Sequence, residues 1–308
     1  MTALLALHVV VLLALPTFVV GAINRTKALW SGRRGQPLAQ LAFDVVRLLR
    51  KRAVYSRGTT PVFRLTPWLG LATALAAGLL VPVLGSTAPI SFPFDFVAFA
   101  YVWGLGRVAL ILGALDTGSA FEGMGASREA TFAALLEPAF FLVAGAMCLL
   151  TNKRSFSAVL ELRPTGAIDG AAWVASVVAL FIVVQVESAR MPVDDPTTHL
   201  ELTMVHEVMV LDHSGPDLAA LQAGAAIKLT VGLSLVAALV NPVVGHATPL
   251  ATAAVNVMLT LALAIAVGTV ESLVARLAMR AVPRYVVAGV VAGGIALLAT
   301  TFGAGGTG

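Results

Sequence analysis

Long apolar stretches alternate with short polar segments along the whole chain. Eight of them have roughly the 20 residues that a helix needs to cross the hydrocarbon core of a membrane. They cover residues 3–22, 67–85, 93–115, 130–150, 170–187, 218–240, 248–270 and 283–303. None alternates apolar and polar positions as the strands of a membrane barrel do. The pattern predicts an all-α integral membrane protein of about eight transmembrane helices, the first of which is retained and not cleaved as a signal peptide.

The segments between these stretches are too short to form a separate soluble domain. The chain is 58% hydrophobic and only 12% charged, whereas about a quarter of the residues of a soluble domain are charged. We therefore expect residues 1–308 to form a single polytopic membrane domain. Its main polar loops are predicted at residues 23–66, 116–129, 188–217 and 271–282.

Basic residues collect in alternate loops. Fifteen lysines and arginines lie in or beside the four loops just named, and three lie in the remaining loops. Because cytoplasmic loops carry an excess of basic residues, this asymmetry predicts an inner-membrane protein with these four loops in the cytoplasm and both termini outside. Most carboxylates lie on the same side, which the topology rule does not require. We therefore expect the cytoplasmic face to be a functional surface.

Three charged residues fall inside predicted spans, namely Arg107, Glu137 and Lys228. Each costs about 2.5–3.5 kcal/mol at a helix centre unless it is paired or hydrated, so each is a candidate functional residue. The alternative is a structural ion pair or, for Arg107, a side chain that extends to the membrane surface. Pro138 removes a backbone hydrogen bond next to Glu137, and we expect a hydrated pocket around this carboxyl group.

The densest group of ionisable residues lies between positions 187 and 217. Pro192 and Pro196 are expected to break any continuous helix here, and a polar segment beside an apolar helix can fold back into a cavity enclosed by protein. Carboxylates and imidazoles in such a cavity can pass protons through water. The group comprises Glu187, Arg190, Asp194, Asp195, His199, Glu201, His206, Glu207, Asp212, His213 and Asp217.

Three of these residues, His199, His206 and His213, recur every seven positions. This spacing predicts one shared helical face, which is either a metal or haem site or a solvated or interface face. The second interpretation is favoured, because no span carries a central histidine to complete a site.

Several kinds of reaction centre are absent from the sequence. There is no Walker A, GxSxG, CxxC or HExxH pattern, and the single Cys148 cannot hold an iron–sulfur cluster. We therefore expect no catalytic residue, bound metal or cofactor in this chain. If it serves a redox reaction, the redox centres lie in partner subunits.

Four polar segments resemble a known family. Residues 32–51, GRRGQPLAQLAFDVVRLLRK, and 64–68, RLTPW, are similar to the first cytoplasmic loop of the respiratory complex I membrane subunit 1 family. Residues 115–138 and 187–217 resemble its hydrogenase-4 and formate hydrogenlyase branch, which belongs to the group 4 [NiFe]-hydrogenases. The resemblance covers nearly the whole chain.

The resemblance implies an eight-span, complex I subunit 1-like bundle that anchors a hydrophilic arm and adjoins antiporter-like membrane subunits. The [NiFe] centre and iron–sulfur clusters are expected in hydrogenase large and small subunits on the cytoplasmic face, and no nucleic acid is expected. By motif, the proton path includes Asp116, Glu122, Glu129, Glu137, Glu187, Asp194, Asp195, Glu201 and Glu207, supported by Arg128, Arg190 and His199. The docking face includes Arg33, Arg34, Gln40 and Asp44. By position alone, Lys228 joins the path, with Arg107 and His206 as supporting groups.

Three functions fit these features. The favoured one is a docking and proton-conducting subunit of a membrane-bound hydrogenase, without a redox centre of its own. The second is the membrane subunit that lines the quinone chamber in a complex I-type NADH-quinone oxidoreductase. The third is a stand-alone secondary transporter, against which the lack of an internal repeat counts.

Overall fold

The computed structural model describes residues 2–161, 164, 166–194, 204–275 and 277–305, and within them every regular element is a helix. Eight helices are long and apolar enough to span a membrane, as predicted. They are α1 (Thr2–Trp30), α3 (Pro61–Leu80), α4 (Asp95–Asp116), α5 (Ala120–Thr151), α7 (Ala167–Glu187), α8 (Gly215–Val240), α9 (Pro249–Leu273) and α10 (Val282–Gly305). Shorter elements are α2 (Gln40–Leu49), α6 (Phe156–Val159) and the 3-10 helix η1 (Glu207–Val210).

Several predicted boundaries are wrong, because hydropathy marks the part of a helix that suits lipid and not the whole helix. Residues 116–129 are not a loop, since α5 begins at Ala120 and continues through Pro138. The second span begins at Pro61 instead of residue 67 and ends at Leu80. Its start is set by Thr60, whose hydroxyl accepts the N–H of Val62 at 3.2 Å, the usual role of a capping threonine. The predicted loop 23–66 likewise contains the end of α1 and all of α2.

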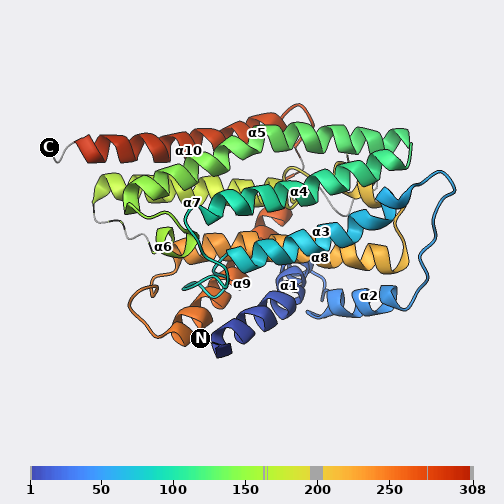
Figure 1. Ribbon diagram of the computed structural model, residues 1–308, viewed down its shortest axis with the longest axis horizontal. Coiled ribbons are helices and arrows are strands. Elements are labelled where there is room, and N and C mark those ends of the chain that lie inside the picture. Colours follow the sequence, from blue (N-terminus) through green and yellow to red (C-terminus); the bar gives the residue numbers. More distant parts are fainter. Residues whose placement is uncertain (1, 162–163, 165, 195–203, 276, 306–308) are drawn as a thin grey trace.

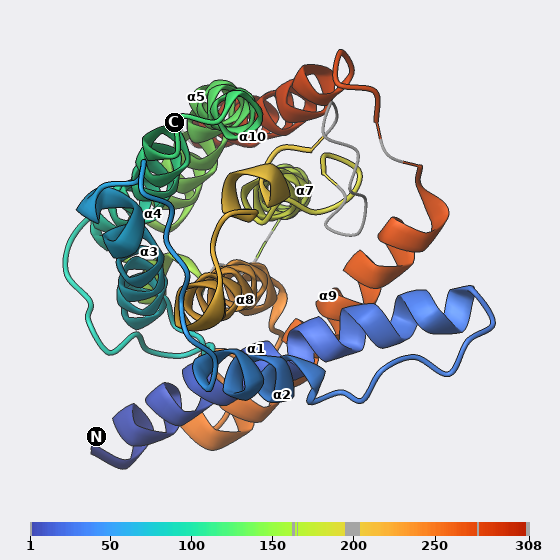
Figure 2. The ribbon, with the colours of Figure 1, turned by 90° about the vertical axis from the view of Figure 1, so that its right-hand side faces the viewer.

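The long helices run roughly side by side, with α8 at the centre of the bundle (Figures 1 and 2). Helix α8 packs against α1, α2, α3, α7 and α9. Its sequence is apolar or small on nearly every side, which is typical of a helix surrounded by protein. Other neighbouring pairs are α3–α4, α5–α10, α7–α10 and α1–α9.

Helix α1 crosses the bundle obliquely and meets α9 closely (Figure 2). At the crossing, a Cβ atom on Gly268 would lie 2.9 Å from the carbonyl oxygen of Ile23. Glycine is therefore required for this close approach of two backbones. The short helix α2 follows α1 and packs beside α8 at one end of the bundle, called the α2 end below (Figure 1).

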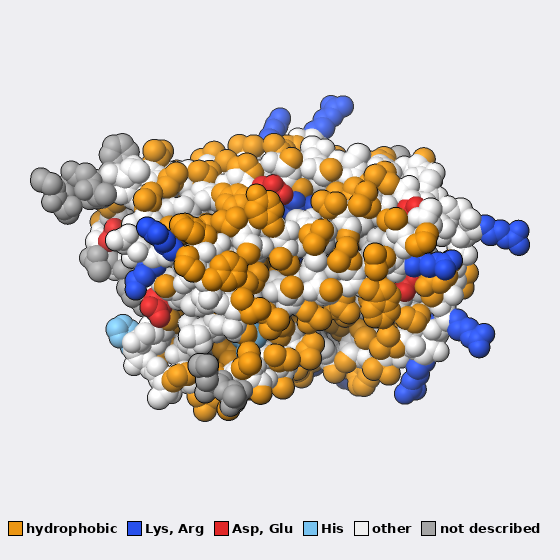
Figure 3. Space-filling model, viewed as in Figure 1, with side chains coloured by type: hydrophobic (Ala, Val, Ile, Leu, Met, Phe, Trp, Pro, Cys, Tyr) orange, Lys and Arg blue, Asp and Glu red, His pale blue; other side chains and the backbone are white. Residues whose placement is uncertain are grey.

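The outer surface fits a membrane environment. One face is covered largely by hydrophobic side chains, while most of its Lys and Arg side chains project from the edges (Figure 3). Near the middle of this face, acidic and basic atoms lie side by side (Figure 3). The chain is thus a multi-pass membrane protein with a few charges at the depth of the apolar belt.

Candidate functional site

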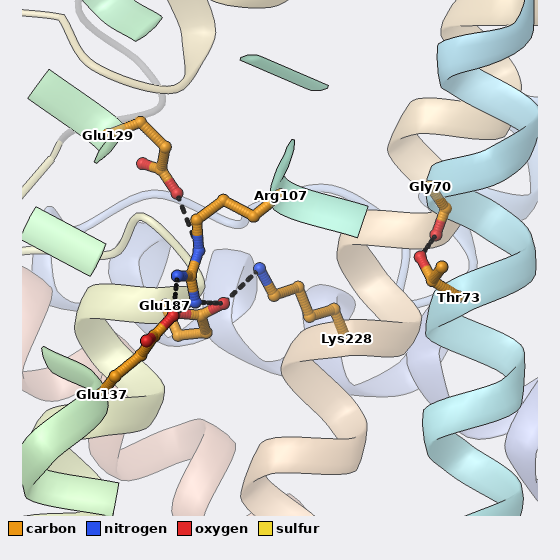
Figure 4. Close-up of polar contacts among 7 residues, drawn as sticks. All are labelled: Gly70, Thr73, Arg107, Glu129, Glu137, Glu187 and Lys228. Atoms are coloured by element: carbon orange, nitrogen blue, oxygen red, sulfur yellow. Dashed lines mark hydrogen bonds and ion pairs between the residues drawn. The ribbon is translucent and has the colours of Figure 1, made fainter. Parts of the chain in front are cut away.

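A cluster of charged side chains lies inside the bundle, where α4, α5, α7 and α8 meet. The Nη2 atom of Arg107 donates to both carboxylate oxygens of Glu187, at 2.8 and 2.7 Å. The Nζ atom of Lys228 lies 2.7 Å from the same carboxylate (Figure 4). The side chain of Glu187 is only 3% exposed. Arg107 therefore pairs inside the protein and does not extend to the membrane surface.

Two more carboxylates of α5 share the Arg107 guanidinium. The Oε1 atom of Glu137 lies 3.1 Å from Nη1, and that of Glu129 lies 3.8 Å from Nε (Figure 4). Their spacing of eight residues places both on one side of α5. With every group ionised, the cluster contains two cations and three carboxylates, a net charge of −1. One proton would neutralise it, which is a suitable arrangement for a site that accepts and releases protons.

Trp103 adds an aromatic wall that the sequence analysis did not single out. Its ring centroid lies 5.6 Å from the Lys228 Nζ atom, close enough for a cation–π contact. Trp103 and Arg107 are four residues apart on α4, so they lie on the same side of that helix. This spacing was the signal in the sequence that would have found the tryptophan.

A cavity of about 260 Å³ adjoins the cluster. A water molecule in the liquid occupies about 30 Å³, so the cavity has room for several. Its apolar side is formed by residues of α1, α2 and α3, including Val20, Leu41 and Ala74. Its charged and imidazole side chains are those of Arg107, Glu129, Glu187, Arg190, Asp194, His206, Glu207 and Lys228. The structure thus brings eight of the predicted residues to one cavity.

The turn after α7 carries part of the cavity wall. Asp194 ends the described part of this turn, and its Oδ2 atom accepts the N–H groups of Val205 and His206 at 3.2 and 2.9 Å. These bonds hold the 188–194 turn against the segment that begins at Met204. Burial, followed by the nearby Lys228 ammonium, keeps the pKa of His206 below its usual 6.5. A neutral imidazole therefore faces the cavity near pH 7.

The predicted histidine face is wrong for the two histidines that the structure describes. A single turn of 3-10 helix follows His206, and α8 begins only at Gly215, so no continuous helix joins His206 to His213. His213 instead stacks on Phe63, with ring centroids 3.9 Å apart. Burial lowers the pKa of His213 to about 4. Among the described residues, no group of three or more His, Cys, Asp or Glu side chains is placed to hold a metal ion.

Other predicted path residues lie away from the cavity or outside the described residues. Asp116 accepts the backbone N–H and the hydroxyl of Thr60, both at 2.7 Å, and so joins the end of α4 to the start of α3. Glu122 is buried on α5 but does not line the cavity. Arg128 donates to the carbonyl oxygen of Met204 at 2.8 Å. Asp195, His199 and Glu201 lie outside the described residues.

Glu137 differs from the rest of the cluster because its side chain is 56% exposed. It lines a groove of about 30 Å³ between α4 and α5, not the main cavity. The carboxyl group therefore reaches from Arg107 toward the outer, apolar face of the bundle. A hydrated pocket was predicted around the Glu137 carboxyl group. The cavity of about 260 Å³ is larger than this groove and lies on the other side of the Arg107 guanidinium.

The predicted docking residues lie at the α2 end. Arg33 and Arg34 are exposed in the segment between α1 and α2. On α2, the Gln40 amide donates to Asp44 at 3.1 Å, and Arg47 donates to the same carboxylate at 2.7 Å. Arg33, Arg34 and Arg47 are exposed, whereas Gln40 and Asp44 are partly buried.

Comparisons with known proteins agree with this architecture. The model of the protein family described as NADH dehydrogenase matches residues 2–302. Hydrogenase-4 component C of Escherichia coli (strain K12) is 28% identical over 233 residues, which cover 76% of this chain and 73% of that protein. Formate hydrogenlyase subunit 4 of the same strain is 26% identical over 232 residues, covering 74% of each.

One solved structure has a similar fold. It is a chain of the membrane-bound sulfane sulfur reductase (MBS), an archaeal respiratory membrane complex, and it superposes with a TM-score of 0.79. The match covers 96% of this chain and 97% of that one, at 16% sequence identity. At this identity the likeness shows the shared fold alone.

Proposed function

Because the chain belongs to the family described as NADH dehydrogenase, we propose that it is the membrane-anchor subunit of a membrane-bound hydrogenase complex. Its relatives are membrane subunits of hydrogenase-4 and formate hydrogenlyase. The complex proposed is of the group 4 [NiFe] type. Its [NiFe] centre and iron–sulfur clusters would belong to large and small subunits docked on this chain, and the chain itself would carry protons.

The cluster around Arg107 is the observation that supports a proton path best. Glu187 and Glu129 are buried and adjoin a cavity with room for water. Buried charges at the depth of a membrane are costly and are typical of proton paths. With one carboxylate more than it has cations, the cluster can change its protonation state without leaving a lone charge in the bundle.

The α2 end is the proposed docking face for the hydrophilic arm. It carries the exposed Arg33, Arg34 and Arg47, and the basic loops predict that it faces the cytoplasm. Antiporter-like membrane subunits are the proposed neighbours at the depth of the membrane. The half-exposed Glu137 supports this, because a carboxylate against lipid would be costly and a neighbouring helix would cover it.

The test of the proton path uses the assembled complex in inverted membrane vesicles. Glu129→Gln removes a proton-carrying group from the cavity while keeping its size. We expect proton translocation to fall to background when it is normalised to dye-linked hydrogenase activity, which reports the amount of assembled complex. Glu161→Gln, at an exposed position between α6 and α7, is the matched control. Unchanged translocation by Glu129→Gln would refute the path.

A second candidate function rests on the apolar side of the cavity. Residues of α1, α2 and α3 give it a wall suited to an apolar ring or tail, with charges on the opposite side. The corresponding membrane subunit of a complex I-type NADH-quinone oxidoreductase would use it as a quinone chamber. A photoreactive quinone analogue that labels this chain at Val20 or Leu41, and is displaced by excess quinone, would favour this function. Labelling only of lipid-facing residues would exclude it.

A further inference from the structure

A second buried charged cluster adjoins the proposed proton path and shares Arg190 with it. Glu271, in the last turn of α9, has a side chain that is 0% exposed. Its carboxylate oxygens lie 3.0 Å from the Nζ atom of Lys27, on α1, and 3.5 Å from the Nη1 atom of Arg190, in the turn after α7. From the sequence, Glu271 is the first residue of the predicted loop 271–282, and no role was predicted for it.

These three residues join two sides of the bundle. Helix α9 packs mainly against α1 and α8, whereas α7 packs against α5, α8 and α10 (Figure 2). The two groups of helices therefore share α8, and the Glu271–Arg190 pair links them a second time. The backbone supplies a further link here, because the N–H of Leu277 donates to the carbonyl oxygen of Pro192 at 3.0 Å.

Arg190 is the residue around which the 188–194 turn is built. Its N–H donates to the carbonyl oxygen of Gln185 at 2.9 Å. Its own carbonyl oxygen accepts the N–H groups of Val193 and Asp194, at 3.0 and 3.3 Å. Arg190 and Asp194 also line the main cavity beside Glu187. A displacement of the Arg190 side chain would therefore also move part of the cavity wall.

We propose that Glu271 is a positioning residue for the proton path, and this inference rests on the proposed function. The buried carboxylate holds the Arg190 guanidinium at the α9 side of the turn. Without it, an arginine in the cavity wall would be attracted to the carboxylates of Glu187 and Asp194. A new ion pair there would keep those groups ionised and shift the turn. Lys27 fixes the other side of Glu271 to α1.

The test is Glu271→Gln in the assembled complex, with two independent measurements. The first is hydrogen exchange of the backbone N–H groups of Arg190, Val193 and Asp194, followed by mass spectrometry. Removing one partner of a buried ion pair destabilises the structure around it, so we expect these N–H groups to exchange about tenfold faster or more. The second is proton translocation in vesicles, normalised to dye-linked activity, which we expect to fall at least threefold.

A double-mutant cycle separates positioning from a general structural effect. If Glu271 acts through Arg190, then Glu271→Gln should change neither measurement further in an Arg190→Gln background. Arg190→Lys, which keeps the charge, should restore most of the protection lost in Arg190→Gln. If Glu271→Gln fails to assemble, Arg190→Gln gives the same two measurements. Glu161→Gln is again the matched control.

Four outcomes decide the inference. Faster exchange with lost translocation, both non-additive with Arg190→Gln, supports it. Unchanged exchange in Glu271→Gln overturns it. Faster exchange in Glu271→Gln with full translocation also overturns it, provided that Glu129→Gln abolishes translocation in the same assay. If Glu129→Gln has no effect on translocation, the proposed proton path fails, and the positioning role fails with it. Hydrogen exchange then shows separately whether Glu271 anchors the turn.

Discussion

Glu187 holds the interior cluster together, and replacing it by glutamine gives the sharpest test of the energetics. Glu187→Gln keeps the shape of the side chain and removes one negative charge. Arg107 retains Glu129 and Glu137 as neighbours. Lys228 loses its only ion pair in the described part of the chain, and the Trp103 ring, 5.6 Å from its Nζ atom, does not replace a carboxylate. An unpaired ammonium in the bundle is therefore the main consequence.

The magnitude follows from the contacts that are lost. The carboxylate of Glu187 makes two short bonds to Arg107 and one short contact to Lys228. Breaking a buried pair by removing one partner costs about 3–5 kcal/mol. The glutamine oxygen can still accept one bond from Arg107, so we expect a loss at the lower end, about 3 kcal/mol.

The assay is reversible unfolding of the purified chain in mixed micelles, with increasing SDS as the denaturant. Glu187→Gln is compared with Lys228→Met and with the double variant. Since the double variant has no unpaired ammonium, we expect it to be more stable than Glu187→Gln alone, by about 1–2 kcal/mol. Glu161→Gln is the control and should stay within about 0.5 kcal/mol of the unaltered chain.

Two results would refute this reasoning. If Glu187→Gln unfolds at the same SDS fraction as the unaltered chain, the cluster does not stabilise the bundle. If the free-energy losses of Glu187→Gln and Lys228→Met simply add, the two side chains are not coupled. The 2.7 Å contact between them would then carry no net free energy.

Two further predictions concern packing and pH. Gly21→Ala should destabilise the chain by about 1–3 kcal/mol, because the new Cβ atom would overlap the backbone carbonyl oxygen of Leu38, in the segment after α1. The control in the same SDS titration is Gly104→Ala, whose Cβ atom would have no heavy atom within 4 Å. For His213, the unfolded state binds a proton near pH 6.5 and the folded state only near pH 4, so stability should fall as pH drops through this window, by up to roughly 3 kcal/mol. His213→Phe, which keeps the stacking on Phe63, should unfold with less change between pH 7 and 5, and an unaltered pH dependence would contradict this assignment.

Hydropathy was sufficient to predict the eight spans and the all-α fold, because each span must offer lipid about 20 apolar residues. It did not predict where the helices begin and end. Residues 120–129 are polar enough to read as a loop, yet they form the first turns of α5. Helices that continue beyond the lipid carry no hydropathy signal there, so their ends depend on caps such as Thr60.

The candidate site was predictable as a set of residues but not as an arrangement. Arg107 and Lys228 stood out because charge inside a span is rare, and Glu129 and Glu187 stood out by motif. Only the packed bundle shows that all four meet, and that Glu137 reaches the outer face instead of the cavity.

Other features were decided by tertiary structure alone. Glu271 looked like an ordinary residue at a helix end until α1 and the turn after α7 brought Lys27 and Arg190 to it. His213 was expected to share a helical face with His206, and it lies on Phe63 instead. The composition of each segment determines whether it can enter a membrane. Which side chains meet depends on how helices far apart in the chain rotate and pack around α8, and no local stretch of sequence contains that information.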